Sequence, residues 1–230
     1  MSLCNKNNNT SDHKLDVNVN VIEKEPGTEK TRLVKKKKLI EYKILVLGDL
    51  KVGKTSLLQS IQIFSVLNSN ELQYNNTIKP TTIPKIIDIF SREYDYDKFK
   101  LKITYIDSII KEPILTKQNL KNIDLVYLCF DIFNINSFGD TLIWITKIKE
   151  FNKINNKNIN IPILLIGCKS DIRDSVSNCI KSETFHQYAL SKGAINFVEC
   201  SSKTNYNIDT IIDISKTVLM KSYVNKCKIL

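Results

Sequence analysis

The residues best suited to chemistry form one segment, Gly48 to Thr55, which fits the pattern G-x-x-x-x-G-K-[ST]. It lies between an apolar run and a stretch with helical spacing, as a phosphate-binding loop requires. Glycines let backbone N–H groups turn toward a phosphate, and Lys54 supplies positive charge for the β- and γ-phosphates. The Thr55 hydroxyl is a ligand for Mg²⁺. The candidate phosphate-binding residues are Gly48, Asp49, Leu50, Lys51, Val52, Gly53, Lys54, Thr55 and Ser56.

Two further motifs follow apolar runs in the second half of the chain. Cys168-Lys169-Ser170-Asp171 follows one run, and Ser201-Ser202-Lys203 follows the next. A carboxylate such as Asp171 can accept hydrogen bonds from both N1–H and N2–H of guanine, whereas adenine has an acceptor at N1. The aspartate therefore favours guanine, with a penalty of about 1 to 3 kcal/mol for the group left unpaired by adenine. A surface turn after a core strand is the alternative interpretation of either motif alone.

The elements that must position these motifs alternate along the chain. Short β-branched runs alternate with segments at helical spacing, which predicts an α/β fold with a mostly parallel sheet and ligands beyond the carboxyl ends of its strands. Trp144 is predicted to lie in the core. We expect Ile83–Phe90 and Leu101–Ile106 to form an antiparallel edge pair. The remaining predicted strands are Tyr42–Leu47, Leu125–Phe130, Ile163–Gly167 and Asn196–Glu199.

The three motifs together resemble those of small GTPases of the Ras superfamily, and residues 167–174 and 197–203 look most like the Rho/Rac branch. The resemblance covers residues 41–230. It implies a P-loop NTPase fold, with a six-stranded mostly parallel sheet and helices on both faces, that binds GTP or GDP with Mg²⁺. It also implies effector and regulatory proteins as partners, among them an exchange factor, a GTPase-activating protein and a dissociation inhibitor. The base-binding residues that it assigns are Cys168, Lys169, Asp171, Ser201, Ser202 and Lys203, where Cys168 replaces the usual Asn or Thr.

The resemblance also assigns the Mg²⁺ ligands. Lys79-Pro80-Thr81-Thr82 is similar to the first switch, in which a threonine closes on the metal and the γ-phosphate. Thr81 is the predicted ligand, with Thr82 as the alternative. The interval from Thr55 to Thr81 is longer than this family usually has. Asp107 ends a strand and would bind Mg²⁺ through water, so the predicted metal residues are Thr55, Thr81 and Asp107.

The second switch departs from the family pattern Asp-x-x-Gly-Gln. Ile110 replaces the glycine whose N–H meets the γ-phosphate, and Lys111 replaces the glutamine that positions the attacking water. A lysine has donors and no acceptor, so it cannot orient that water. Leu50 would also crowd the space that an arginine finger needs. We expect weakened GTP hydrolysis. The alternatives are a competent GTPase in which other residues replace the glutamine, and an interaction module that no longer uses nucleotide.

Composition indicates an ordinary globular protein. The chain has 230 residues, of which 42% are hydrophobic and 25% charged. Its apolar runs are strand-sized, far short of the ~20 residues that span a bilayer, and its N-terminus has no secretory signal. The six cysteines have no metal or disulfide spacing, so we expect free thiols. The predicted domains are an Asn-rich, basic, disordered extension over residues 1–40, the GTPase domain over 41–222 and a C-terminal tail over 223–230.

The net charge of +10 is concentrated near the ends of the chain. Lys35–Lys38 precede the domain, and Lys216, Lys221, Lys226 and Lys228 follow the last acidic residue. Two basic patches at the edges of a domain fit an anionic membrane surface, at about 1 kcal/mol per basic residue near the lipid. A solvated charge run is the alternative for Lys35–Lys38. No RNA-binding aromatic pattern or zinc-finger spacing supports nucleic acid as a partner.

The last four residues form a lipidation motif. Cys227-Lys228-Ile229-Leu230 fits C-a-a-X with leucine last, which predicts geranylgeranylation of Cys227. One prenyl chain gives reversible membrane binding, and the nearby lysines supply the second signal that stable anchoring requires. The expected location is the cytoplasmic face of the cell membrane, with a cytosolic pool.

Overall fold

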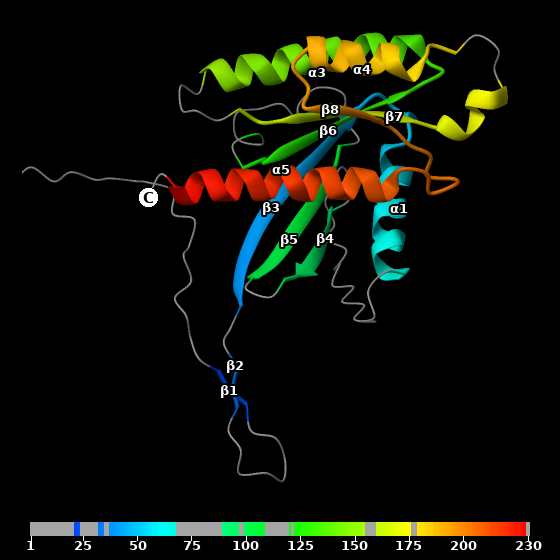
Figure 1. Cartoon of the computed structure of the whole chain (residues 1–230). Helices are drawn as coiled ribbons and strands as arrows, with labels where there is room; N and C mark the ends of the chain where they lie inside the picture. The colour runs from blue at the N-terminus through cyan, green and yellow to red at the C-terminus, as the bar shows by residue number, and fades with distance from the viewer. Residues whose placement is uncertain are drawn as a thin grey trace, which may run out of the picture. The chain divides into compact units, whose positions relative to one another are not determined.

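The computed structural model describes residues 21–23, 32–34, 37–67, 89–96, 99–108, 120, 122–154, 160–175 and 179–228 (Figure 1). Its strands are β1 (Val21–Glu23), β2 (Arg32–Val34), β3 (Lys38–Gly48), β4 (Ile89–Asp95), β5 (Phe99–Asp107), β6 (Leu125–Asp131), β7 (Ile163–Cys168) and β8 (Asn196–Glu199). Its helices are α1 (Lys54–Leu67), α3 (Ile135–Ile154), the 3₁₀ helix η1 (Ser170–Ser175), α4 (Ser182–Ser191) and α5 (Ile208–Lys228).

Six of the strands form one sheet in the order β4-β5-β3-β6-β7-β8. The neighbours β3 and β6, β6 and β7, and β7 and β8 run parallel, which brings the carboxyl ends of all four strands to one edge. The burial of every residue in β7 explains why its sequence is one continuous apolar run rather than an alternating one. The six-stranded, mostly parallel α/β sheet predicted from the sequence is confirmed.

The edge of the sheet corrects one predicted boundary. The sequence predicted a strand over Ile83–Phe90, but β4 (Ile89–Asp95) continues five residues past that predicted end. Residues 83–88 lie outside the described part of the chain. The antiparallel pairing with β5 is confirmed, because residues earlier in β4 contact residues later in β5. Next to the turn, Tyr96 N–H donates to Phe99 O; farther from it, Ser91 contacts Thr104 and Phe90 stacks on Tyr105.

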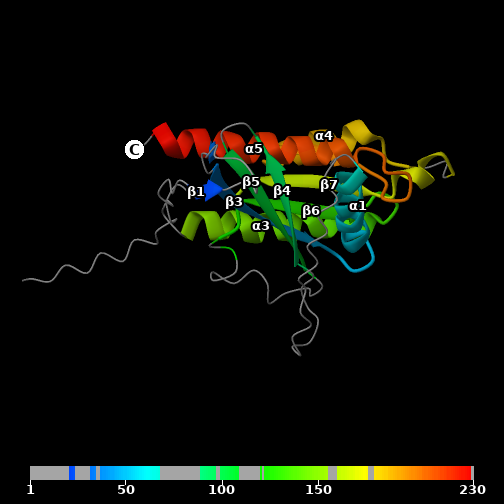
Figure 2. The same ribbon diagram turned by 90° about the horizontal axis from the view of Figure 1, so that it is seen from below.

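Helices cover both faces of this sheet. Side chains of α3 and α4 pack with one face in a cluster that contains Trp144, Ile148 and Phe185, so the prediction that Trp144 is a core residue is confirmed. On the other face, the hydroxyl groups of Tyr127 in β6 and Ser215 in α5 lie 2.6 Å apart. α1 lies beside α5 on that face, as two views show (Figure 1, Figure 2).

Two elements of secondary structure extend past the predicted bounds of the domain. β3 begins at Lys38, before the predicted start at residue 41, and α5 continues to Lys228, past the predicted end at residue 222. Within the segment predicted to be disordered, β1 and β2 form a short antiparallel ladder. None of the helices in the described ranges combines the length and the apolar composition that crossing a bilayer requires.

Candidate functional site

The loop between β3 and α1 has positive φ angles both at glycines and at one residue with a side chain. Gly48 has a φ of 137°, and a Cβ atom there would lie 2.1 Å from the carbonyl oxygen of Cys129, so only glycine fits. Lys51 has a φ of 63°, which is uncommon for a residue with a side chain. Leu50 is 56% exposed at the outer surface of this loop.

Lys54, the first residue of α1, turns back over the loop that precedes it. Its ammonium group donates to the carbonyl oxygens of Gly48 at 2.8 Å and Asp49 at 2.7 Å, and the residue is only 7% exposed. Its charge is therefore held inside the curve of the loop. An ammonium has three donors, so one N–H remains for an anion in this position.

Thr55 and Asp107 meet beside the loop although 52 residues separate them in the chain. The Thr55 hydroxyl donates to Oδ2 of Asp107 at 2.6 Å. Asp107 is fully buried, and its Oδ1 has no hydrogen-bond partner among the described residues. A buried carboxylate oxygen without a partner is costly unless a cation or a bound water satisfies it. The pair therefore fits a hard cation such as Mg²⁺, which prefers oxygen ligands.

The two motifs after β7 and β8 are joined by direct hydrogen bonds. The buried hydroxyl of Ser201 donates to Oδ1 of Asp171 at 2.7 Å, and the backbone N–H of Ser170 donates to the carbonyl oxygen of Cys200 at 3.1 Å. Lys203 Nζ lies 3.9 Å from the other carboxylate oxygen of Asp171. The Asp171 carboxylate thus has one oxygen fixed by Ser201 and its position set by both loops.

Lys169 is held by a residue that the sequence analysis did not select. Its ammonium donates to Oδ2 of Asp131, the last residue of β6, at 2.8 Å, and Oδ1 of Asp131 accepts the backbone N–H of Phe133. Lys169 has a φ of 68°, so the ion pair accompanies an uncommon backbone conformation. Asp131 could have been considered from its place directly after an apolar strand, at the same edge of the sheet as Lys169.

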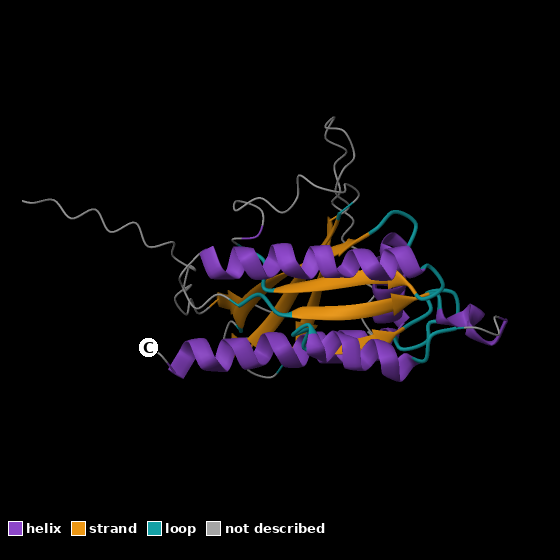
Figure 3. Cartoon of the chain, turned by 90° about the horizontal axis from the view of Figure 1, so that it is seen from above, coloured by secondary structure: helices purple, strands orange, loops and turns teal. Residues whose placement is uncertain are grey.

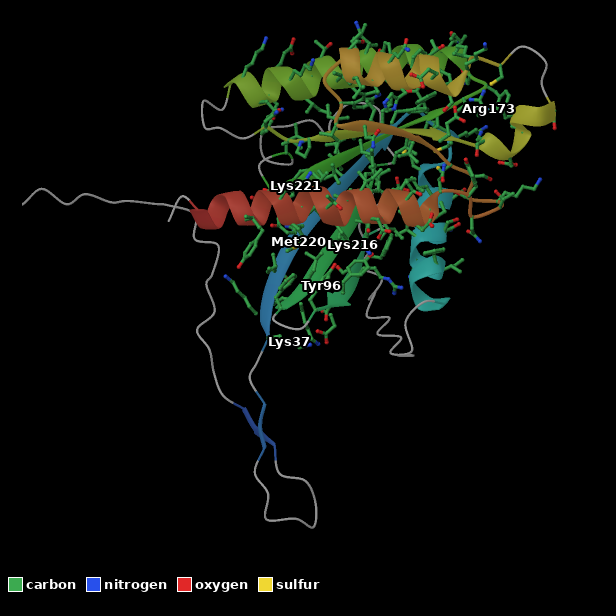
Figure 4. The ribbon with its side chains drawn as sticks, in the orientation of Figure 1. Lys37, Tyr96, Arg173, Lys216, Met220 and Lys221 are labelled. Carbon is green, nitrogen blue, oxygen red and sulfur yellow. The ribbon has the colours of Figure 1, made fainter. Side chains whose placement is uncertain are left out.

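A second ion pair anchors η1, the element that carries Asp171. The guanidinium of Arg173 forms two hydrogen bonds with the carboxylate of Glu199 in β8, and Nη1 donates to the carbonyl oxygen of Ile180 at 2.8 Å. Figure 4 labels Arg173 on this element. The pair ties η1 to the strand that leads into Ser201.

These elements surround one cavity of about 450 Å³ at the carboxyl edge of the sheet. Figure 3 shows the loops that follow the strands gathered at this end. The cavity brings together the end of the phosphate loop and both base motifs, as the sequence predicted, through Gly53, Ser56, Cys168, Lys169, Asp171, Ser202 and Lys203. Gln59, Ser60, Ile63 and Ile172 also line it and were not predicted. These residues reach the cavity because α1 and η1 turn that side toward it, and the orientation of a helix about its axis is not specified by a short motif.

Several predicted site residues lie outside the described part of the chain. They are Thr81 and its alternative Thr82 in the first switch, and Ile110 and Lys111 in the second. The backbone of Cys227 belongs to α5, and the structure describes nothing of its side chain. No group of three or more His, Cys, Asp or Glu residues suited to a metal occurs in the described ranges.

Comparison with known proteins agrees with this geometry. Residues 43–221 match the model of the Ras family. The chain is 31% identical over 183 residues to the Rho-related protein racM of Dictyostelium discoideum, covering 74% of this chain and 85% of racM. It is 23% identical over 187 residues to the GTP-binding protein RHO1 of Candida albicans, covering 76% and 85%. The match to the Ras-related protein RabV of Dictyostelium discoideum is 33% over 130 residues, covering 56% of this chain and only 50% of RabV.

The family match covers residues 43–221. The geometry of the phosphate loop and the hydrogen bond that joins the two base loops are consistent with that family. Relatives of both the Rho and the Rab type share this similarity. Proteins of this kind bind GTP or GDP, generally with Mg²⁺, and act as signalling switches. The chain belongs to the Ras family of small GTPases and has Rho-like relatives.

Proposed function

We propose that this chain is a membrane-anchored guanine-nucleotide switch that hydrolyses GTP slowly. The observation that carries the nucleotide site is the 450 Å³ cavity, because residues from the phosphate loop and from both base motifs line it together. A surface turn after a core strand would not bring Asp171 to the same cavity as Gly53. The volume lies within the range of small-molecule sites in proteins.

The base of the nucleotide is read by Asp171. Ser201 holds one carboxylate oxygen at 2.7 Å, so the side chain is oriented before ligand binds. That orientation reduces the entropy lost on binding. Lys169, Ser202 and Lys203 line the same cavity. In this proposal they contact the base and ribose. Cys168 replaces the Asn or Thr of related proteins and offers a weaker hydrogen bond there.

The phosphates lie in the loop from Gly48 to Ser56. Its backbone N–H groups and the ammonium of Lys54 neutralise the phosphate charge. Thr55 and Asp107 hold Mg²⁺, which is supported by their 2.6 Å contact and by the unpartnered buried Oδ1 of Asp107. Bound Mg²⁺ neutralises charge on the β- and γ-phosphates. Thr81 supplies the third protein ligand, with Thr82 as the alternative.

The proposal of slow hydrolysis rests on two residues that replace the glycine and the glutamine of the second switch. Lys111 cannot accept a proton from the attacking water, and Ile110 replaces the switch glycine. Leu50, more than half exposed on the phosphate loop, narrows the space for an arginine finger. The competing proposal is a competent GTPase in which another residue orients the water.

Single-turnover hydrolysis of pre-loaded GTP separates these two proposals. We expect a rate constant below the ~10⁻⁴ s⁻¹ of ordinary small GTPases without an activating protein. Ile110→Gly combined with Lys111→Gln is expected to raise the rate, whereas Lys100→Gln, at an exposed position of β5, is a matched control. A wild-type rate at or above ~10⁻⁴ s⁻¹ would support the competent enzyme.

Membrane attachment uses Cys227 and the basic end of α5. Lys216 and Lys221 lie on this helix, as Figure 4 shows, and no acidic residue follows Asp213 in the chain. A geranylgeranyl group on Cys227 and attraction to anionic lipid together place the protein at the cytoplasmic face of the cell membrane, with a cytosolic pool. Its partners there are effectors, an exchange factor, a GTPase-activating protein and a dissociation inhibitor.

The nucleotide itself is tested on protein purified under native conditions. We expect bound GDP or GTP, released by denaturation and identified by chromatography. We also expect GDP with Mg²⁺ to stabilise the protein by about 2.7 kcal/mol at a free concentration 100-fold above Kd, whereas ADP leaves it unchanged. Absence of both bound nucleotide and stabilisation would favour a nucleotide-independent interaction module.

A further inference from the structure

Three cysteine thiols lie together below the nucleotide cavity. Cys129 is in β6, Cys168 is the last residue of β7, and Cys200 follows β8 directly. All three are buried free thiols. The base-recognition proposal uses Cys168 only as a weak replacement for Asn or Thr, and it gives no role to the other two.

Cys168 is the central member and the one that lines the cavity. It lines the cavity although only 3% of the residue is exposed, and its Cβ would lie 3.3 Å from a Cβ built on Gly53 of the phosphate loop. The thiols of Cys129 and Cys200 are on the two neighbouring strands: Cys200 is the next residue after the pair Gly167–Glu199, and Cys129 pairs with Ile166, two residues before Cys168. These two thiols lower the pKa of Cys168 below its usual range, whereas the contact with Cys168 and burial raise the pKa values of Cys129 and Cys200.

We propose that Cys168 is an oxidation site, that Cys200 is its resolving thiol, and that the resulting disulfide and bound guanine nucleotide disfavour each other. The oxidant is hydrogen peroxide, which is small enough to enter the cavity. The part of this proposal that concerns nucleotide rests on the proposed function. The part that concerns the Cys168–Cys200 bond does not.

The chemistry proceeds in two balanced steps. The Cys168 thiolate attacks one peroxide oxygen; an S–O bond forms, the O–O bond breaks, and the departing hydroxide takes a proton to become water, leaving a sulfenic acid. The Cys200 sulfur then attacks the Cys168 sulfur; an S–S bond forms, the S–O bond breaks, and the thiol proton leaves with hydroxide as a second water. Two thiols are oxidised by two electrons, and one peroxide is reduced to two waters.

The strand register selects Cys200 over Cys129 as the partner. Gly167 of β7 pairs with Glu199 of β8, and Cys168 and Cys200 are the next residue on each chain. Neighbouring strands lie about 4.8 Å apart, within the Cα separation that a disulfide spans. Cys129 lies opposite Ile166, two residues before Cys168, so its Cα is diagonal to that of Cys168. A diagonal pair lies at about 7 to 8 Å, beyond that separation.

The disulfide would disturb the base loops because both begin at the joined residues. An S–S bond is about 2.05 Å long, shorter than any contact between two thiols, so the two side chains must turn toward each other, and the Cys168 side chain lies against Gly53 of the phosphate loop. Lys169 follows Cys168, and Ser201, which orients Asp171, follows Cys200. Oxidation is therefore expected to weaken GDP binding. By thermodynamic linkage, bound GDP must shift the equilibrium between the dithiol and the disulfide toward the dithiol by the same factor. Bound GDP also covers the Cys168 thiol, which is expected to slow its reaction with peroxide.

The experiment treats full-length protein with hydrogen peroxide under three conditions: EDTA without added nucleotide, excess GDP with Mg²⁺, and excess ADP with Mg²⁺. Non-reducing peptide mapping by mass spectrometry then reports each of the six cysteines. We expect a Cys168–Cys200 disulfide that forms at least ten times more slowly with GDP than with ADP or EDTA. The oxidised protein is expected to bind GDP at least tenfold more weakly, with recovery in dithiothreitol.

Variants identify the thiols. Cys200→Ser should leave Cys168 as a sulfenic acid trapped by dimedone, Cys129→Ser should still form the disulfide, and Cys179→Ser, outside the cluster, should behave as wild type. If Cys200→Ser does not fold, as judged by its thermal unfolding, Cys200→Ala replaces it. Protein that binds GDP without forming the disulfide, or with equal oxidation rates in GDP and ADP, would overturn the inference. A disulfide in protein that never binds GDP would instead overturn the proposed function and the nucleotide linkage while retaining the oxidation site.

Discussion

The hydroxyl of Ser201 donates to Oδ1 of Asp171 across 2.7 Å and so joins the loops that follow β7 and β8. Ser201 is fully buried, so the hydrogen bond is shielded from water. Because the acceptor is a charged carboxylate, the bond is of the stronger kind. The Asp171 side chain, which we propose reads the base, is therefore oriented by a residue from a different loop, 30 positions later in the chain.

Ser201→Ala tests this orientation. Removing a hydrogen bond to a charged group costs about 1.5 to 3 kcal/mol, so GDP affinity is expected to fall by roughly 10- to 150-fold. Titration with a fluorescent GDP analogue measures the change. Thr204→Ala is the matched control, since this exposed threonine lies in the same turn and contributes only its backbone N–H to Ser201. Equal affinities for both variants would show that Ser201 does not orient the base reader.

Lys54→Ala tests the phosphate loop. We expect GDP and GTP affinity to fall by at least 100-fold. The reason is that, among the described residues of the loop, Lys54 carries the only buried ammonium group. The ligand-free protein should remain folded, with Tm lowered by no more than about 5 °C, since the two lost hydrogen bonds are to loop carbonyls. Lys43→Ala, an exposed lysine of β3 outside the loop, is the control. Unfolding of Lys54→Ala before any ligand is tested would assign the residue to the fold instead.

Asp107→Asn tests the Mg²⁺ site. In the wild type, EDTA is expected to accelerate GDP dissociation at least tenfold, because Mg²⁺ joins the nucleotide to the protein. In Asp107→Asn the rates with and without EDTA should be nearly equal, since the neutral amide is a weaker acceptor than the carboxylate for a water bound to Mg²⁺. Stopped-flow release of a fluorescent GDP analogue gives both rates. Asp209→Asn in the first turn of α5 is the control, and a retained response to EDTA in Asp107→Asn would exclude this carboxylate.

Cys227→Ser tests membrane attachment. One prenyl chain binds membranes reversibly at about 0.8 kcal/mol per buried methylene, so losing it should move the protein almost wholly to the soluble fraction. Neutralising Lys216, Lys221 and Lys226 to Gln should weaken attachment in part and make the remainder less sensitive to salt. Membrane fractionation at two salt concentrations measures both effects. Unchanged fractionation of Cys227→Ser would exclude lipidation as the anchor. Lys35–Lys38 would then be the next candidate for membrane binding, which deletion of residues 1–40 tests.

Much of the site could be predicted from the sequence because its motifs are short and lie at strand ends. The segment Gly48–Thr55 specifies its own turn, and the parallel order of β3, β6, β7 and β8 then brings separate strand ends to one edge. The ion pair between Lys169 and Asp131 could not be predicted in the same way. It joins two residues 38 positions apart and depends on an uncommon φ at Lys169, which no local pattern indicates.

Two strand boundaries show where local patterns mislead. β4 alternates half-buried and exposed residues from Phe90 to Asp95, so its solvent side is polar and it has no apolar run to mark it. Polar and charged side chains are typical of an edge strand, which must avoid pairing with other chains. β3 begins in a lysine-rich segment, and its early part shows only the alternation of buried Ile40 and Tyr42 with exposed Glu41 and Lys43.

Nucleotide selection by Asp171→Asn tests the central claim most directly, namely that this cavity reads guanine. The account predicts that Asp171→Asn binds GDP at least tenfold more weakly and binds xanthosine diphosphate more tightly than the wild type does. The reason is that the amide donates to the oxygen that replaces the N2 amine. Competition of GDP and xanthosine diphosphate against one fluorescent nucleotide, on wild type and variant side by side, gives both affinities. An unchanged preference for GDP in Asp171→Asn would contradict the account.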